Sequence, residues 1–186
     1  MRAPSTLPLA IALALAAAAP LAAQPACVGL ELSGVASTTV FADGFESGDA
    51  TRWSEPWHPG FSTTATEDLG VTVEIGAGTP GDHLLELRWW LPGERLYQSV
   101  AVPFGAGGAA AAAERRIEGY PYPVPLRAAR ERERTGFGAV LAVEDRLPVA
   151  GSSIVDAGLW GEWRVEAYLD GGAEPCTPPV AFRLEP

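Results

Sequence analysis

The chain has 186 residues, of which 47% are hydrophobic and 19% are charged, and this composition suits a single domain with its own core. The formal net charge of −10 argues against a nucleic-acid-binding protein, because an acidic surface repels phosphate groups at long range. All 13 basic residues are arginine, which excludes chemistry that needs a Schiff-base lysine or a P-loop lysine.

The first 23 residues have the pattern of a secretory signal peptide. Arg2 precedes an apolar block from Leu7 to Ala19, and small residues follow up to Ala23. The block is too short for a transmembrane span, and no later segment approaches the necessary length. We therefore expect cleavage after Ala23 and an exported protein, periplasmic or extracellular. Its net charge changes from −10 to −11 with the loss of Arg2.

Two cysteines, Cys27 and Cys176, lie near the two ends of the expected exported chain. In an oxidising compartment such a pair is expected to form a disulfide. Two free thiols are the alternative. A lipid-modified Cys27 is another, although Gln24-Pro25-Ala26 matches a lipoprotein signal poorly. A metal site is not expected, because structural zinc sites use closely spaced pairs of ligands.

Residues 24–67 are expected to form a loop-rich N-terminal segment, with room for one or two short strands between residues 28 and 41. The run FADGFESGDATRW, residues 41–53, resembles the DGFESGD segment near the start of many bacterial secreted proteins, and this resemblance implies export. The acidic residues here could bind Ca²⁺, but their spacing does not match an EF-hand loop, and a solvated acidic linker is the preferred interpretation. These residues are Asp43, Glu46, Asp49 and Glu55.

Residues 68–186 are predicted to form the folded domain. Apolar and polar residues alternate with period two in several runs, which is typical of strands with one face in a core. These runs lie at 71–75, 83–91, 96–104, 137–143, 163–169 and 180–184, with a shorter one at 154–155. About seven short strands, separated by Gly- and Pro-rich turns and accompanied by little helix, predict an all-β fold, an antiparallel β-sandwich.

The run from Trp163 to Leu169 alternates most regularly. Its apolar positions, beginning with Trp163, are expected in the core, whereas Arg164, Glu166 and Tyr168 are expected to face water. Asp170-Gly171-Gly172 then supplies a turn, because glycine adopts positive φ without a steric clash.

Three stretches between the predicted strands have their own character. Residues 105–113 are rich in Gly and Ala, and either a short helix over 109–116 or a flexible insertion fits them. Tyr120 to Pro125 must be extended, because each proline restricts its own φ and the residue before it. The run RAARERER, residues 127–134, fits an exposed strand or a helical turn. On a strand it would be a charged edge that opposes aggregation.

Two longer patterns resemble known modules. The run LPVAGSSIVDAGLWGEWRVEAYLDG with the later VAFRL is similar to the closing strands of bacterial immunoglobulin-like and macroglobulin-like modules, and LELRWWLPGERLYQSVAVPF is similar to their early hairpin. The resemblance covers residues 71–184 and implies an immunoglobulin-like sandwich. The chain differs from antibody domains, since its cysteines do not flank a core tryptophan at the usual spacing.

Aromatic residues provide the main candidates for a binding site. Trp89 and Trp90 are adjacent on one strand, so one ring faces the core and the other faces away. Leu85, Leu87 and Leu91 share the face of Trp89 and place that ring inside, which leaves Trp90 outside. Trp90, Tyr120 and Tyr122 are therefore the candidate binding residues. Such rings pack under a connection, anchor a protein interface or stack on sugar rings.

No catalytic residue, cofactor or metal site is predicted. His58 and His83 lie in separate segments without an HExxH pattern, and the sequence has no Gly-x-Ser-x-Gly elbow. Carboxylates from separate strands could converge as they do in glycosidases, but nothing in the sequence selects two of them. The candidates for such a pair are Glu86, Glu94, Glu144 and Asp145.

These observations predict a non-enzymatic exported β-sandwich that acts as an interaction or structural module at the bacterial cell envelope, with an envelope protein as its partner. The alternative is a carbohydrate-binding module that stacks an extracellular glycan on exposed aromatic rings. The fold class does not decide between them, because sandwiches host both functions.

The signal-peptide assignment gives a direct test. Intact-mass analysis of the secreted protein should give a chain that begins at Gln24, because the small residues that end at Ala23 form the expected cleavage site. A secreted chain that begins before Pro20 would contradict the assignment.

Overall fold

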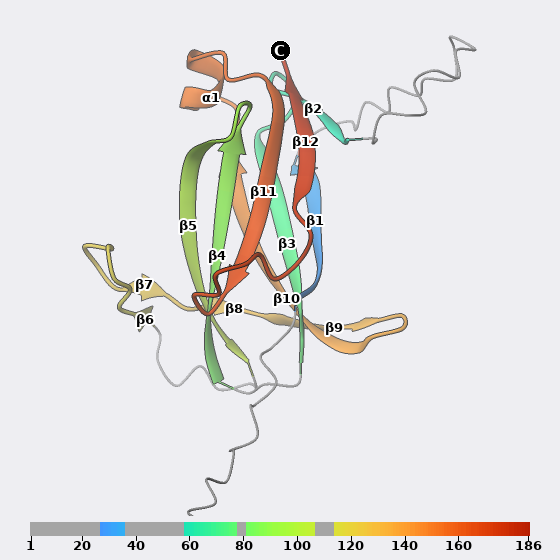
Figure 1. Ribbon diagram of the computed structural model, residues 1–186, viewed down its shortest axis with the longest axis vertical. Coiled ribbons are helices and arrows are strands. Elements are labelled where there is room, and N and C mark those ends of the chain that lie inside the picture. Colours follow the sequence, from blue (N-terminus) through green and yellow to red (C-terminus); the bar gives the residue numbers. More distant parts are fainter. Residues whose placement is uncertain (1–26, 36–57, 78–80, 107–113) are drawn as a thin grey trace, which may run out of the picture.

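The computed structural model describes residues 27–35, 58–77, 81–106 and 114–186, which form two β-sheets packed face to face (Figure 1). Sheet A is antiparallel. Its strand order is β1 (Cys27–Val35), β3 (Asp68–Gly76), β10 (Gly138–Pro148) and β9 (Arg130–Arg134).

Sheet B is larger and has two short edge strands. Its strand order is β2 (Gly60–Ser62), β12 (Val180–Glu185), β11 (Gly161–Leu169), β4 (Gly81–Leu91), β5 (Arg95–Ala106) and β8 (Arg127–Ala128). The four inner strands are antiparallel, whereas β2 and β8 run parallel to their neighbours. The remaining elements are the paired strands β6 (Glu114–Arg115) and β7 (Val124–Pro125) and the single-turn helix α1 (Ser153–Asp156).

This architecture confirms the predicted fold class, an all-β antiparallel sandwich. The order β1-β3-β10-β9 opposite β12-β11-β4-β5 is the ABED and GFC order of immunoglobulin-type sandwiches, with one strand added beside strand C. Among the described residues, eight strands have five or more residues, close to the seven or so expected, and four shorter ones accompany them.

The sandwich begins earlier in the chain than the predicted boundary at residue 68. Strand β1 pairs with β3 over its whole length, and β2 pairs with the end of β12, so both belong to the sheets although they lie within 24–67. The alternation of β1 is weak, so the sequence pattern does not mark it as a strand of the domain, although its Leu30 and Leu32 pack against the core. The acidic residues considered for Ca²⁺ lie outside the described residues.

The hydrophobic core lies between the two sheets, as period-two alternation requires. Trp163 on β11 is 1% exposed, and its ring packs against Tyr97 and Phe182 with centroid distances of 5.2 and 6.1 Å. Its indole N–H donates to the carbonyl of Leu159 at 2.9 Å. Trp89 is fully buried and Trp90 lies on the opposite face of β4, as predicted.

The structure shows which secondary structure two segments of the chain adopt. Residues 154–155, predicted as a short strand, lie in helix α1 instead, because Ser152 caps its first turn by accepting a hydrogen bond from Ile154 N at 3.2 Å. The arginine-rich run forms strands β8 and β9. On β9, Arg132 and Arg134 share one face and form ion pairs with Glu144 and Glu74 of sheet A.

The expected disulfide between Cys27 and Cys176 is present, with Cα atoms 5.3 Å apart. It joins β1 of sheet A to the connection between β11 and β12 of sheet B. The two cysteines are 149 residues apart in the sequence. In the chain-entropy model, a crosslink that closes so long a loop stabilises the fold by about 4–5 kcal/mol. The disulfide therefore holds the N-terminal strand against the rest of the sandwich.

The core position of Trp163 leads to a stability prediction. Trp163→Ala should lower the free energy of unfolding by about 3–5 kcal/mol, because it opens a cavity and removes an indole from the core. Trp160→Ala is the matched control, since this indole is 45% exposed, and it should cost much less. Urea denaturation of both variants measures the difference; equal losses would contradict the core assignment.

Candidate functional site

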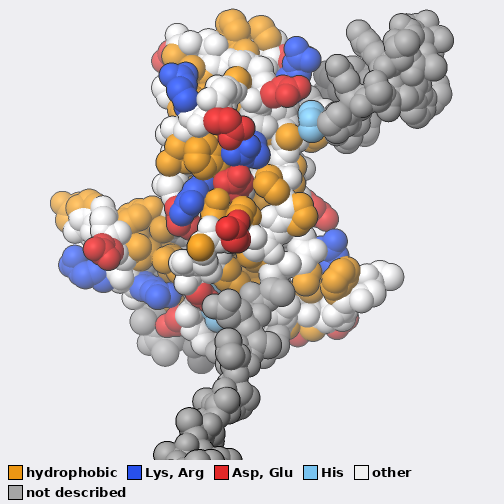
Figure 2. Space-filling model, viewed as in Figure 1, with side chains coloured by type: hydrophobic (Ala, Val, Ile, Leu, Met, Phe, Trp, Pro, Cys, Tyr) orange, Lys and Arg blue, Asp and Glu red, His pale blue; other side chains and the backbone are white. Residues whose placement is uncertain are grey.

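The outer face of sheet B carries the most developed group of polar and aromatic side chains, and it faces the viewer in Figure 2. On this face acidic and basic side chains alternate along β4 and β11, where Figure 1 places these strands in front. We call this group the outer ladder. Its members are Glu86, Arg88, Trp90, Glu94, Arg164, Glu166 and Tyr168.

The centre of the outer ladder is the carboxylate of Glu166, which is 7% exposed. One of its oxygens accepts hydrogen bonds from the indole N–H of Trp90 at 2.8 Å and from the hydroxyl of Tyr168 at 2.9 Å. Its other oxygen lies 3.0 Å from Nε of Arg164. A buried carboxylate is stable only with such partners, so these three side chains hold Glu166 in place.

The burial of this face corrects one prediction. Period-two alternation predicts that Glu166 and Tyr168 face water, but Tyr168 is only 6% exposed. The guanidinium of Arg88 lies over the Tyr168 ring, 3.9 Å from its centroid, and covers it. Burial, reinforced by the hydrogen bond that it donates to Glu166, raises the pKa of the Tyr168 hydroxyl. Arg164, as expected, remains partly exposed.

Arg164 connects β11 to the turn between β4 and β5. It forms a bidentate pair with Glu94, with N–O distances of 2.8 and 2.7 Å, and the hydrogen bonds to Glu94 raise the pKa of its guanidinium. The same guanidinium lies 5.3 Å from the centroid of the Trp90 ring. Trp90 is thus half-buried beneath an arginine, which leaves less of its ring available for a ligand.

At the other end of the outer ladder, Glu86 forms a second local network. It pairs with Arg88 at 2.7 and 3.1 Å and accepts a hydrogen bond from Ser99 at 2.7 Å. The hydrogen bond from Arg88, which outweighs partial burial, lowers the pKa of Glu86. Glu86 is therefore held as a carboxylate at neutral pH.

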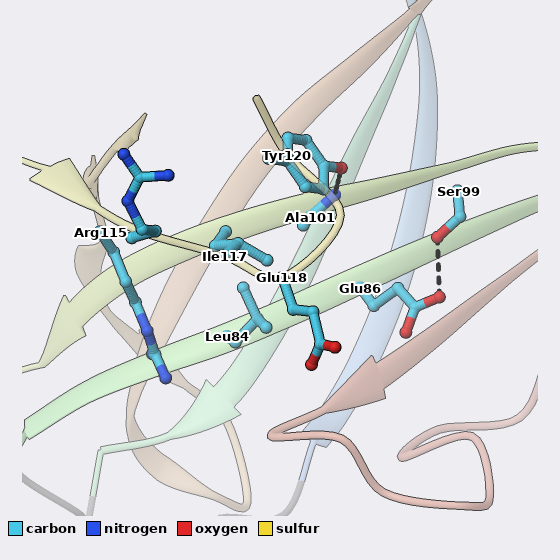
Figure 3. Close-up of a pocket in the computed structure, with 9 residues that line it drawn as sticks. Leu84, Glu86, Ser99, Ala101, Arg115, Ile117, Glu118 and Tyr120 are labelled. Atoms are coloured by element: carbon cyan, nitrogen blue, oxygen red, sulfur yellow. Dashed lines mark hydrogen bonds between the residues drawn. The ribbon is translucent and has the colours of Figure 1, made fainter. Parts of the chain in front are cut away.

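A cavity of about 480 Å³ adjoins this network on the same face (Figure 3). Its floor is formed by Leu84 and Glu86 of β4 and by Ser99 and Ala101 of β5, and its wall is formed by residues 115–120. The side chains of Ile117 and Glu118 project from this segment toward β4 and β5 (Figure 3). The segment is fastened by Tyr120, whose hydroxyl accepts a hydrogen bond from Ala101 N at 2.9 Å.

The three aromatic candidates occupy different places. Trp90 lies near the β4–β5 turn, opposite Leu96, whereas Tyr120 binds β5 at Ala101. Five residues of strand separate these points, which corresponds to about 17 Å. Tyr122 is 78% exposed and lies beyond the cavity wall. Of the three, only Tyr120 lines the cavity.

The four carboxylates considered for catalysis are divided between the sheets. Glu86 and Glu94 belong to the outer ladder, and Glu144 points outward from sheet A toward Arg132. Asp145 has its side chain 10% exposed and pairs with Arg127 at 3.2 Å; burial raises its pKa. The described structure therefore does not assemble these groups into a single acid–base pair.

The histidines also have separate surroundings. The buried ring of His83 lies 2.8 Å from a carboxylate oxygen of Asp170 and stacks against Phe104. Asp170 additionally accepts a hydrogen bond from Leu84 N, so the contact fastens the turn after β11. His58 lies just before β2, which forms one edge of sheet B.

Within the described ranges, no group of three His, Cys, Asp or Glu residues could hold a metal ion, and no helix is long and apolar enough to cross a membrane. In comparisons with known proteins, no protein-family model matches the chain, and no curated protein is significantly similar to it.

The lowered pKa of Glu86 predicts a pH-dependent stability. Its ionised form contributes stability above its unfolded pKa of about 4.3, and this contribution is lost as the pH falls through the lowered folded pKa. Glu86→Gln should thus be less stable than the parent protein at pH 7, and the difference should shrink below about pH 4.3. Urea denaturation across this range measures it.

The matched control is Glu162→Gln, which removes an exposed carboxylate from the same face. This variant should change stability little. A difference between Glu86→Gln and the parent protein that stays constant from pH 7 to pH 3 would show that the Glu86 charge is not linked to folding.

Proposed function

We propose that this chain is a non-enzymatic exported β-sandwich that acts as an interaction module at the bacterial cell envelope and makes its contacts through the outer face of sheet B. The observation that carries the proposal is the network of Glu166 with Trp90, Tyr168 and Arg164. It holds polar and aromatic groups of the central strands β4 and β11 in place, and preorganised groups lower the cost of ordering side chains when a partner binds.

The electrostatics of the outer ladder favour recognition over catalysis. A general acid at neutral pH needs a raised pKa, but the pKa of Glu86 is lowered by its bond to Arg88. The hydrogen-bonding capacity of Glu166 is taken up by Trp90 and Tyr168 of the same protein. Charges that are already paired contribute shape and specificity to a contact.

Export is supported by three observations. The first 23 residues have a signal-peptide pattern, and the DGFESGD run resembles segments of secreted bacterial proteins. The Cys27–Cys176 disulfide is of a kind that persists in oxidising compartments. These observations favour the periplasm or the cell exterior as the site of action.

A carbohydrate-binding module remains the second candidate. It is favoured by one observation, the cavity next to Tyr120, since the three aromatic candidates lie apart from one another. In this version of the function, a sugar would be enclosed in the cavity instead of lying on a row of aromatic rings.

Site-specific photo-crosslinking tests the proposed contact face. A photoreactive residue replaces Glu162, which is exposed on the outer face of sheet B, or Glu31, which is exposed on sheet A, in the secreted protein in its native cells. We expect one defined adduct from position 162 and none from position 31. Arg164→Gln should abolish the adduct, because it removes the pair with Glu94 and loosens this face.

Two results would contradict the proposal. Equal adducts from both positions would mean that sheet B is not the contact face. An adduct from position 162 that survives Arg164→Gln would mean that the outer ladder does not define the contact.

A further inference from the structure

The charged side chains around the cavity differ from those of the outer ladder in one respect. Every charged side chain of the outer ladder has a hydrogen-bonded or ion-paired partner. By contrast, Arg115, Arg116 and Glu118 in the cavity wall have no side-chain partner within the described part of the chain. Of the arginines described, only Arg95 shares this condition.

Arg115 carries the strongest indication of a ligand. One of its terminal guanidinium nitrogens is buried and has no hydrogen-bond partner among the described residues. Leaving a buried donor unsatisfied is costly, more so for a charged group, and such atoms in native proteins usually have a reason. A ligand oxygen in the adjoining cavity would satisfy this nitrogen.

The other cavity groups offer a balanced set of partners. The Tyr120 hydroxyl accepts a hydrogen bond from Ala101 N, which leaves its own proton free to be donated. Glu118 is exposed and offers an acceptor, while Leu84 and Ile117 offer an apolar surface between these groups. The site thus combines donors, an acceptor and an apolar floor.

We propose that this cavity is a saccharide-binding site, in which Arg115 and Tyr120 donate to ring or hydroxyl oxygens and Glu118 accepts from a hydroxyl. A hydroxyl both donates and accepts, so adjacent hydroxyls on one ring match an arginine and a carboxylate together. The C–H face of the ring matches Leu84 and Ile117. The cavity volume, about 480 Å³, lies within the range of small-molecule sites. This inference rests on the proposed role of the outer face of sheet B as the contact face.

The charges suggest which sugars to compare. Glu86 is already compensated by Arg88, so the unpaired groups are two arginines and one glutamate. Neutral sugars would use the arginines as hydrogen-bond donors, whereas a uronic acid would also place its carboxylate on them as a bidentate pair. Salt separates the two cases, because binding of a charged ring weakens with ionic strength and binding of a neutral ring does not.

The test is to titrate the complete secreted protein with five probes and to measure binding by calorimetry and saturation-transfer NMR. The probes are maltose, cellobiose, di-N-acetylchitobiose and digalacturonic acid, with inorganic phosphate as a non-sugar anion. We expect at least one saccharide to bind. Arg115→Gln and Glu118→Gln should each weaken its affinity by about tenfold or more, as expected for a charged hydrogen bond.

Two substitutions serve as matched controls. Tyr120→Phe should weaken binding, whereas Tyr122→Phe, at an exposed tyrosine outside the cavity, should not. Arg95 likewise has no side-chain partner among the described residues, but it does not line the cavity. Arg95→Gln should therefore leave the affinity for the saccharide unchanged. Glu118 is exposed, so its variant keeps the test valid if Arg115→Gln fails to fold.

Three outcomes would overturn the proposal: no probe binds, phosphate displaces the bound sugar completely, or the control variants weaken binding as much as the cavity variants. The proposed function is judged separately. A position-162 adduct that depends on Arg164, together with no sugar binding, would reject the saccharide site and keep the interaction module. If no Arg164-dependent adduct forms at position 162 and no saccharide binds, both the interaction module and the saccharide site are rejected.

Discussion

A buried carboxylate must be surrounded by donors, and this requirement organises the outer face of sheet B. Glu166 lies at the middle of β11, where the inner face is already occupied by the core, so its own side is the only one on which donors can be placed. Trp90 meets it from the adjacent strand β4, whereas Arg164 and Tyr168 meet it from the same strand. The network therefore couples the position of β4 to that of β11 in the same way that the core does from the other side.

The same face is divided into a paired and an unpaired region. From Glu94 to Glu86, the charged side chains of the outer ladder pair with one another. This pairing holds them in place and leaves them without a free charge for a ligand. Beyond Ser99, where residues 115–120 cross the strands, the charges of Arg115 and Glu118 are not satisfied by other side chains of the described structure. Glu86 belongs to both regions, since it pairs with Arg88 and also lines the cavity. A ligand there would contact a preorganised floor beneath a wall fastened by Tyr120.

Contacts between residues far apart in the sequence hold the two sheets of the sandwich together. The Cys27–Cys176 disulfide ties the first strand of sheet A to the β11–β12 connection of sheet B. On the opposite side, the chain crosses from β8 in sheet B to β9 in sheet A, and Arg127 near this crossing pairs with the sheltered carboxylate of Asp145. The alternating charges of β9 then occupy an edge of sheet A, where a charged edge strand discourages pairing with another chain.

Period-two alternation by itself determined the all-β class, the inward face of Trp163 and the opposite directions of Trp89 and Trp90, because strand geometry makes neighbouring side chains point to opposite sides. Two cysteines in a chain with a signal-peptide pattern likewise determined the disulfide. Only the tertiary structure decided that Glu166 and Tyr168 are buried, since this depends on which residues of β4 lie beside β11. It also decided that the 115–120 segment covers β5, because local periodicity does not encode which strand a loop lies against.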